Sequence, residues 1–107
     1  MKEITALELK QWHQENKDFQ LIDIREEYEY EICNLASIGS ELIPMGSIME
    51  NLDKIAKDKN VVIHCHRGSR SASVISVLEM HGFNNLYNMT GGITAWINEV
   101  DSSMSDY

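Results

Sequence analysis

Short apolar runs alternate with longer segments of mixed polarity along the whole chain. The clearest run, Val61-Val62-Ile63, is continuous and β-branched, which is typical of a strand buried on both faces of a parallel sheet. Comparable short runs predict four further strands, at residues 3–4, 20–23, 41–43 and 86–88. The segments between them predict helices at residues 5–14, 26–32, 46–56, 71–80 and 92–100. This alternation predicts an α/β fold in which a parallel sheet of about five strands carries helices on both faces.

Local signals agree with several of these boundaries. Thr5 and Glu8 have the spacing of a capping box, in which each residue caps the other at the start of a helix. The only proline, Pro44, directly follows the third predicted strand, and Gly82 ends the helix predicted at 71–80. Residues 101–107 form a polar tail, which we expect to be frayed.

Composition and charge narrow the classes of partner. With 107 residues, 43% of them hydrophobic and 24% charged, the chain has the size and balance of one domain, predicted to span residues 1–107. The net charge of −8 argues against nucleic acid or an anionic membrane surface as a partner, since both attract basic patches. No apolar run reaches the roughly 18–20 residues of a membrane span and no signal peptide is recognised, so we expect a cytoplasmic protein. The cysteines and histidines lack the spacing of a zinc site, and we expect neither a metal nor another cofactor.

The residue most suited to chemistry is Cys65, which follows the strand at 61–63. Only a tight loop separates this strand from the helix predicted at 71–80, and Cys65 opens that loop. In open α/β sheets, ligands bind at the carboxyl ends of the strands, often against the N-terminus of a helix. This position predicts a functional rather than a structural cysteine.

The loop around Cys65 favours a thiolate. Backbone N–H groups in such a turn can form an anion-binding nest, and Gly68 can adopt the positive φ that the turn needs. Arg67 and Arg70 add two positive charges, and no Asp or Glu occurs from residue 60 to residue 78. A cysteine in such surroundings can have its pKa lowered from about 8.5 into the range of roughly 3.5–7.5. The two guanidinium groups are also candidates for binding an anionic substrate.

Three stretches of the sequence together resemble rhodanese-type sulfurtransferases. Residues 65–72 (Cys-His-Arg-Gly-Ser-Arg-Ser-Ala) resemble the active-site loop of that family. Residues 21–26 (Leu-Ile-Asp-Ile-Arg-Glu), with Glu-Tyr at 29–30, resemble its first signature. Gly-Phe at 82–83 and residues 89–96 (Met-Thr-Gly-Gly-Ile-Thr-Ala-Trp) resemble its closing signature. The resemblance covers most of the chain in the family's order and implies a rhodanese-like fold.

The resemblance also implies a transfer reaction at Cys65. In rhodanese-type enzymes the loop cysteine takes the sulfane sulfur of a donor, holds it as a persulfide and gives it to a thiophilic acceptor. The donor is expected to be thiosulfate or a persulfide. The implied active-site loop comprises, after Cys65, the residues His66, Arg67, Gly68, Ser69 and Arg70.

Supporting roles are predicted for residues beside the loop. Asp23 and Arg25 come at the end of the second predicted strand, where we expect them to form a structural ion pair or hydrogen bonds rather than to act in catalysis. Either Ser69 or Ser71 is expected to cap the helix that follows Cys65.

Alternatives to the enzyme remain open. A catalytically silent rhodanese-like domain would use the same surface only to dock a partner, although silent members typically lack the cysteine. A Cys-based phosphatase uses a Cys-x5-Arg loop, whereas the spacing from Cys65 to Arg70 is Cys-x4-Arg. Cys33 could resolve a Cys65 persulfide as a disulfide only if the two Cα atoms lie within about 7 Å of each other.

The stretch before the third strand points to a subgroup and to its partners. Residues 30–35 (Tyr-Glu-Ile-Cys-Asn-Leu) and 41–44 (Glu-Leu-Ile-Pro) are similar to rhodanese domains fused behind ubiquitin-activating-type adenylyltransferases of molybdopterin and thiamine biosynthesis. This likeness implies a sulfur-carrier protein as the acceptor, and a thioredoxin-type protein is the other candidate.

Overall fold

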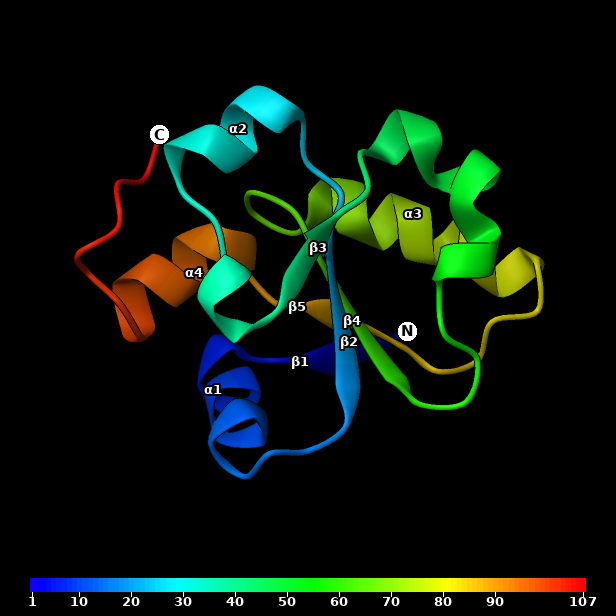
Figure 1. Cartoon of the computed structure of the whole chain (residues 1–107), viewed down its shortest axis with the longest axis horizontal. Coiled ribbons are helices and arrows are strands. Elements are labelled where there is room, and N and C mark those ends of the chain that lie inside the picture. The colour runs from blue at the N-terminus through cyan, green and yellow to red at the C-terminus, as the bar shows by residue number, and fades with distance from the viewer.

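The computed structural model describes residues 1–107 and is built around one five-stranded sheet (Figure 1). The strands are β1 (Lys2–Ile4), β2 (Phe19–Asp23), β3 (Ser40–Leu42), β4 (Asn60–His64) and β5 (Leu86–Met89). They lie in the order β1-β5-β4-β2-β3, and every neighbouring pair is parallel. The predicted parallel sheet is therefore confirmed, and each strand agrees with its predicted range to within one residue at either end.

Four α-helices and two 3₁₀ segments connect the strands. They are α1 (Ala6–Gln14), α2 (Glu27–Ile32), η1 (Ala36–Ile38), η2 (Met45–Lys54), α3 (Ser69–Met80) and α4 (Gly92–Glu99). At the start of α1 both hydrogen bonds of the predicted capping box are present: the Glu8 N–H donates to Thr5 Oγ1, and the Thr5 N–H donates to Glu8 Oε1.

The helix predicted at 46–56 is present, but it is the 3₁₀ helix η2 rather than an α-helix, with non-helical backbone at Asn51. The side-chain amide of Asn51 donates to the carbonyl of Ser47 at 2.7 Å. In an α-helix that carbonyl would accept the backbone N–H of Asn51 instead. Side chains that bond to nearby backbone in this way compete with the helix.

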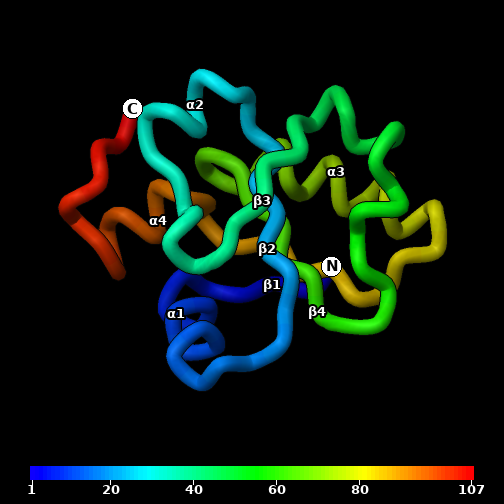
Figure 2. The backbone as a smooth tube through the Cα atoms, in the orientation of Figure 1, coloured from blue at the N-terminus to red at the C-terminus, as the bar shows by residue number.

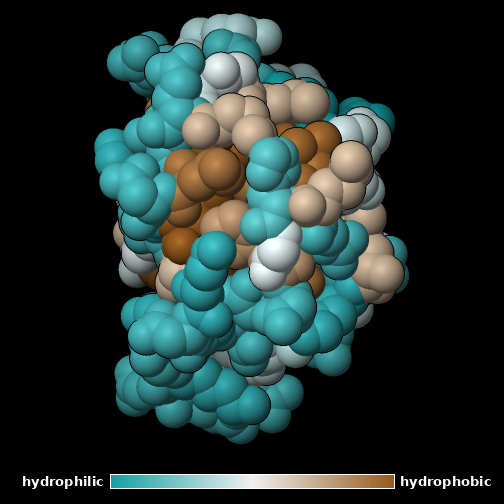
Figure 3. Space-filling view, turned by 90° about the vertical axis from the view of Figure 1, so that its right-hand side faces the viewer, coloured by the Kyte–Doolittle hydropathy of each residue, from teal (hydrophilic) through white to brown (hydrophobic).

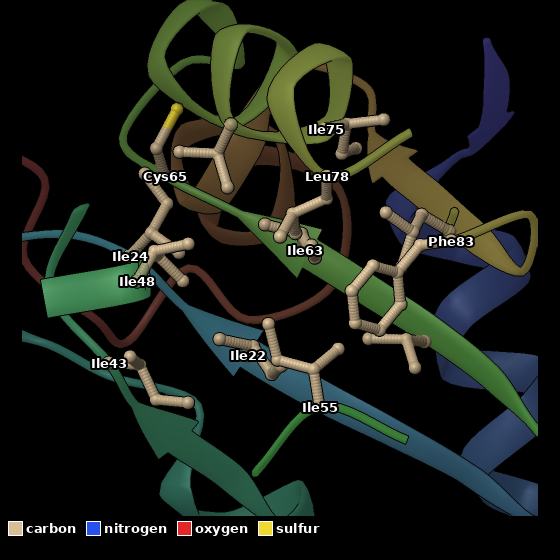
Figure 4. Packing of buried hydrophobic residues seen from close by; sticks show 13 residues of the cluster. Ile22, Ile24, Ile43, Ile48, Ile55, Ile63, Cys65, Ile75, Leu78 and Phe83 are labelled. Carbon is tan, nitrogen blue, oxygen red and sulfur yellow. The ribbon is translucent and has the colours of Figure 1, made fainter. Parts of the chain in front are cut away.

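Two apolar clusters, one on each face of the sheet, form the core. The first lies against η2 and α3 and includes Ile22 and Ile63, which Figure 4 shows from close by. The second lies against α1 and α4 and includes Leu21 and Val62. Neighbouring residues of β2 and β4 thus belong to opposite clusters, as the alternation of side chains along a strand requires. The prediction of helices on both faces is confirmed (Figures 1 and 2).

The side of the molecule formed by η2 and the end of α3 carries exposed apolar side chains (Figure 3). Met49 is 49% exposed, Val77 42% and Met80 86%. In Figure 1 this side lies across the molecule from the C-terminal tail. None of the helices combines the length and the apolar character needed to cross a bilayer.

The polar tail at 101–107, which we expect to be frayed, packs against the rest of the domain in this structure. The N–H of Asp101 donates to the carbonyl of Trp96, and Met104 packs against the apolar cluster beside α4. From there the chain runs back toward α2, next to which it ends (Figure 2). A single apolar residue such as Met104 can anchor a stretch whose average composition is polar.

The start of α4 holds the loop that follows β4. The N–H of Ile93 donates to the carbonyl of Cys65 at 3.0 Å, and the N–H of Thr94 donates to the carbonyl of His66 at 3.1 Å. Gly92, with φ of +59°, permits this approach: a β-carbon there would overlap the His66 carbonyl and lie 2.7 Å from the Arg67 nitrogen. The loop and α4 are thus fitted backbone to backbone.

Replacing Gly92 by alanine is expected to destabilise the protein by about 2–4 kcal/mol. The positive φ contributes about 1–3 kcal/mol of strain to any other residue, and the overlap with backbone atoms adds a packing cost. Equilibrium unfolding in urea measures the change. The matched control is Gly46→Ala, because a β-carbon at Gly46 meets nothing within 4 Å and Gly46 has no positive φ. Equal stability of the two variants would contradict the prediction.

Candidate active site

The sulfur of Cys65 lies inside a ring of hydrogen-bond donors. Cys65 follows β4 directly, α3 begins four residues later, and the residue is 1% exposed. The N–H of Gly68 donates to Sγ at 3.1 Å and the N–H of Ser71 at 3.4 Å. Gly68 has φ of +113°, which agrees with the expected positive φ. The active-site loop, residues 65–70, and the adjoining Ser71 therefore turn their backbone dipoles toward the sulfur.

These contacts set the protonation of the thiol. Burial alone raises the pKa of Cys65, but hydrogen bonds from the Ser71 hydroxyl and from the N–H groups of Ser71, Gly68 and Arg67 outweigh it. The net pKa of Cys65 therefore lies below its ordinary value, and the site favours a thiolate.

The hydroxyl of Ser71 has one proton and three acceptors within reach. Asn88 Oδ1 lies at 2.6 Å, the Gly68 carbonyl at 3.1 Å and Cys65 Sγ at 3.3 Å. Asn88 is the nearest acceptor, so we infer that the backbone N–H groups are the permanent donors to sulfur. The hydroxyl lies close enough to Sγ to donate to it as well.

The helix cap predicted at Ser69 or Ser71 is wrong. The N-cap of α3 is Gly68, and no side chain caps the helix there. Ser71 instead lies fully buried beneath the sulfur, within hydrogen-bonding distance of Asn88 on β5. Asn88 follows no pattern that sequence analysis could use, because it reaches the site through the pairing of β4 with β5.

Arg70 is held by a carboxylate from α2. Its Nη1 and Nη2 donate to the two carboxylate oxygens of Glu29 at 2.8 and 2.9 Å. The hydrogen bonds from Arg70 lower the pKa of Glu29 to about 2 although this carboxylate is buried. Arg67 is exposed and takes part in none of the ion pairs. The segment around Cys65 has no acidic residue of its own, but the fold places the Glu29 carboxylate beside it. Sequence analysis missed this role of Glu29.

Asp23 and Arg25 form an ion pair with no exposed surface. Arg25 Nη2 lies 2.8 Å from Asp23 Oδ2 and also donates to the Cys33 carbonyl at 2.7 Å. His64 lies beside the pair, with Nε2 at 3.8 Å from Asp23 Oδ2 and without a hydrogen-bond partner. Burial lowers the pKa of His64, so the ring is neutral. These groups lie behind the active-site loop and contact neither Sγ nor its donors.

The second cysteine lies apart from the first. Cys33 belongs to the apolar cluster beside α1 and α4, whereas Cys65 belongs to the cluster beside α3, on the other face of the sheet. Both thiols are free and buried. No group of three or more His, Cys, Asp or Glu side chains is placed to hold a metal ion.

The C-terminal tail contributes two residues that sequence analysis missed. The ring of Tyr107 stacks on His66 with centroids 3.9 Å apart and planes 7° from parallel. Asp106 Oδ1 lies 2.9 Å from His66 Nε2. The hydroxyl of Tyr107 donates to Glu29 and accepts from Arg25 Nη1 at 2.9 Å. These partners are distant in sequence, so no local sequence pattern predicts that the tail contacts the loop.

Comparison with known proteins agrees with this geometry. Residues 5–99 match the model of the rhodanese-like domain. The chain is 33% identical over 106 residues to the probable adenylyltransferase/sulfurtransferase MoeZ of Mycobacterium tuberculosis, a match that covers 97% of the chain but 26% of MoeZ. It is 33% identical over 96 residues to a sulfurtransferase of Allochromatium vinosum, with 90% of the chain and 88% of that protein covered.

A solved structure extends the likeness to three dimensions. The rhodanese-like domain protein of Staphylococcus aureus matches with a TM-score of 0.84 and 34% identity, over 100% of this chain and 99% of that one. The sequence match, the parallel sheet and the cysteine loop lead to one conclusion. The chain belongs to the rhodanese-like domain family.

Proposed function

We propose that this protein is a sulfurtransferase that carries a sulfane sulfur on Cys65 as a persulfide. The observation that supports the proposal most directly is the ring of donors around Sγ, with the Gly68 N–H at 3.1 Å and the Ser71 N–H at 3.4 Å. A persulfide needs a nucleophilic thiolate to form and an anion site to hold it. The membership in the rhodanese-like family and the relative named as a sulfurtransferase agree with this chemistry.

The proposed reaction consists of two displacements. The Cys65 thiolate attacks the outer sulfur of thiosulfate, a bond forms between Sγ and that sulfur, and sulfite leaves with the electron pair of the broken sulfur–sulfur bond. An acceptor thiolate or cyanide then attacks the outer sulfur of the persulfide, and Cys65 leaves as a thiolate. No external oxidant or reductant is consumed, and the sequence of steps predicts ping-pong kinetics.

The two loop arginines have different parts in this proposal. Two of the five N–H groups of Arg70 are engaged by Glu29, so Arg70 shapes the loop and keeps its other donors for the donor anion. Arg67 is exposed and unpaired, and it is the first cation that an incoming anion can bind. His66, which stands between Cys65 and Arg67, adds an imidazole rather than a guanidinium to the loop.

The acceptor is proposed to be a protein, either one with a reactive thiol or a sulfur-carrier protein. The relative MoeZ joins, by name, an adenylyltransferase to a sulfurtransferase, and this chain spans about a quarter of it. A sulfur-carrier protein or a thioredoxin-type protein is therefore the acceptor class we propose, with thiosulfate or a persulfide as the donor.

Incubation with thiosulfate is expected to raise the intact mass by one sulfur atom, about 32 Da, and cyanide is expected to remove the added mass. Cys65→Ser should abolish the gain, and Cys33→Ser, which removes the other thiol, should retain it. Failure to form the adduct with thiosulfate and with glutathione persulfide would contradict the proposal. It would favour the silent binding module, and turnover of an aryl phosphate would favour the phosphatase.

Ser71→Ala is expected to raise the pKa of Cys65 by about one unit, because the hydroxyl can donate to the thiolate but is lost in the variant. The pH dependence of iodoacetamide alkylation measures this pKa, since only the thiolate reacts. Ser73→Ala on the same helix is the control, because Ser73 is exposed and bonds only to the Ser69 carbonyl. An unchanged or lower pKa would show that the proton of Ser71 stays with Asn88.

Arg67→Gln is expected to raise the KM for thiosulfate about tenfold with little change in kcat, because a hydrogen bond between charged groups contributes about 1.5 kcal/mol. Steady-state kinetics with cyanide as acceptor measure KM and kcat separately. Lys57→Gln is the control. It also removes one positive charge, but from the segment before β4, at the opposite end of that strand from Cys65, and it should leave KM unchanged. Equal KM values for Arg67→Gln and the unsubstituted protein would exclude Arg67 from donor binding.

A further inference from the structure

Residues 104–107, here called the C-terminal strap, contact the active-site loop although they lie outside the segment that matches the rhodanese-like model, residues 5–99. The strap begins at Met104, which packs beside α4, and ends next to α2 (Figure 2). Its last two residues make all of its contacts with the loop and with the charged groups around it.

The first anchor of the strap is His66, the residue directly after the nucleophile. Tyr107 stacks flat on the imidazole, and Asp106 Oδ1 lies 2.9 Å from its Nε2. Asp106 also accepts from Thr94 Oγ1 at 3.1 Å, which fixes the carboxylate to α4. The outward face of His66 is therefore covered by the strap rather than by solvent, and the His66 side chain is only 18% exposed.

The second anchor is the pair of charges beside α2. The hydroxyl of Tyr107 lies between two of them, as it accepts from Arg25 and donates to Glu29. Glu29 in turn holds Arg70 of the active-site loop. The strap thus spans the surface from α4 to α2, with Tyr107 resting on the loop between them.

We propose that Asp106 and Tyr107 are specificity-determining residues, which limit the size of the acceptor that can reach Cys65. This inference rests on the proposed sulfur transfer. Cys65 is 1% exposed, and a small ion needs only a narrow approach to its sulfur. A protein acceptor must lay its own backbone against the loop, where the strap covers His66. Small acceptors react with the strap in place, and protein acceptors react only when it has lifted.

The anchors of the strap suit a segment that lifts without unfolding the protein. Tyr107 is 37% exposed and the Asp106 side chain 33% exposed, so their contacts are shared with water. Partly exposed polar contacts contribute little each, and segments held by few of them open locally. Reaction with a bulky partner is then reduced by the fraction of molecules in which the strap is open.

The test compares small and bulky thiol reagents on the full chain. Asp106→Ala combined with Tyr107→Ala is expected to raise the rate at which a maleimide on a 5-kDa polyethylene glycol, a size of about that of a small protein domain, modifies Cys65 by at least about tenfold. The rate with iodoacetamide should change by less than about twofold, since the thiolate itself is untouched. Peptide mapping assigns the label to Cys65 rather than to Cys33.

Tyr28→Ala is the matched control, because Tyr28 is a 66% exposed tyrosine of α2. It should leave both rates unchanged. Tyr107→Phe keeps the stacked ring but loses the hydroxyl, and its bulky-reagent rate should lie between those of the unsubstituted protein and the double variant. An unchanged ratio of bulky to small rates in the double variant, or an equal fall in both rates, would overturn the proposal.

The sulfur transfer itself provides a second readout. From a preformed persulfide, transfer to cyanide should be unchanged in the double variant, whereas transfer to reduced thioredoxin should accelerate in parallel with the bulky reagent. If no persulfide forms on the unsubstituted protein, the proposed function fails, but the alkylation rates still decide whether the strap restricts access. If transfer to cyanide and transfer to thioredoxin accelerate by the same factor, the size limit is overturned while the proposed sulfur transfer stands.

Discussion

The guanidinium of Arg25 carries a full charge with no exposed surface, and such a charge costs several kcal/mol unless every donor finds a partner. Asp23 supplies the opposite charge, and the Tyr107 hydroxyl and the backbone carbonyls of Glu29 and Cys33 accept further hydrogen bonds. Because those carbonyls belong to α2 and its C-terminal end, satisfying Arg25 also places α2 over the carboxyl end of β2. The Glu29 side chain can then reach Arg70. The buried charge of Arg25 thus helps to hold the active-site loop indirectly, by positioning α2.

The site is consequently assembled from four segments that meet at the carboxyl end of β4, in the middle of the sheet. β4 delivers Cys65, the start of α4 binds the loop carbonyls, α2 pairs with Arg70, and the tail covers His66. These contacts are made to the backbone carbonyls, the Arg70 guanidinium and the His66 ring of the loop, and none of them is made to the sulfur. This arrangement leaves Sγ surrounded by its own loop, with the rest of the fold holding that loop in shape.

The parts that sequence predicted are those decided by neighbours along the chain. Short apolar segments that alternate with helical ones identify the strands, and the position of Cys65 after β4 follows from that alternation. Two features that sequence analysis missed come from contacts between distant segments. The hydroxyl of Ser71 lies beside Asn88 across the sheet and does not cap α3, and Tyr107 of the tail contacts Arg25 and Glu29, some eighty positions earlier. A third feature is local: the side chain of Asn51 bonds to the Ser47 carbonyl within η2, and an average helix propensity does not include such a contact.

The balance of charge around Cys65 suits the proposed reaction, in which the loop first holds and then releases an anion. Glu29 neutralises Arg70, which leaves Arg67 as the one exposed, unpaired arginine of the loop. Stabilisation of the sulfur therefore comes from the Ser71 hydroxyl and from backbone dipoles, rather than from a direct ion pair. A full ion pair at Sγ would hold a thiolate or a persulfide more firmly and make the outer sulfur harder to give away. Fixed dipoles lower the pKa of the thiol while leaving the anion able to react.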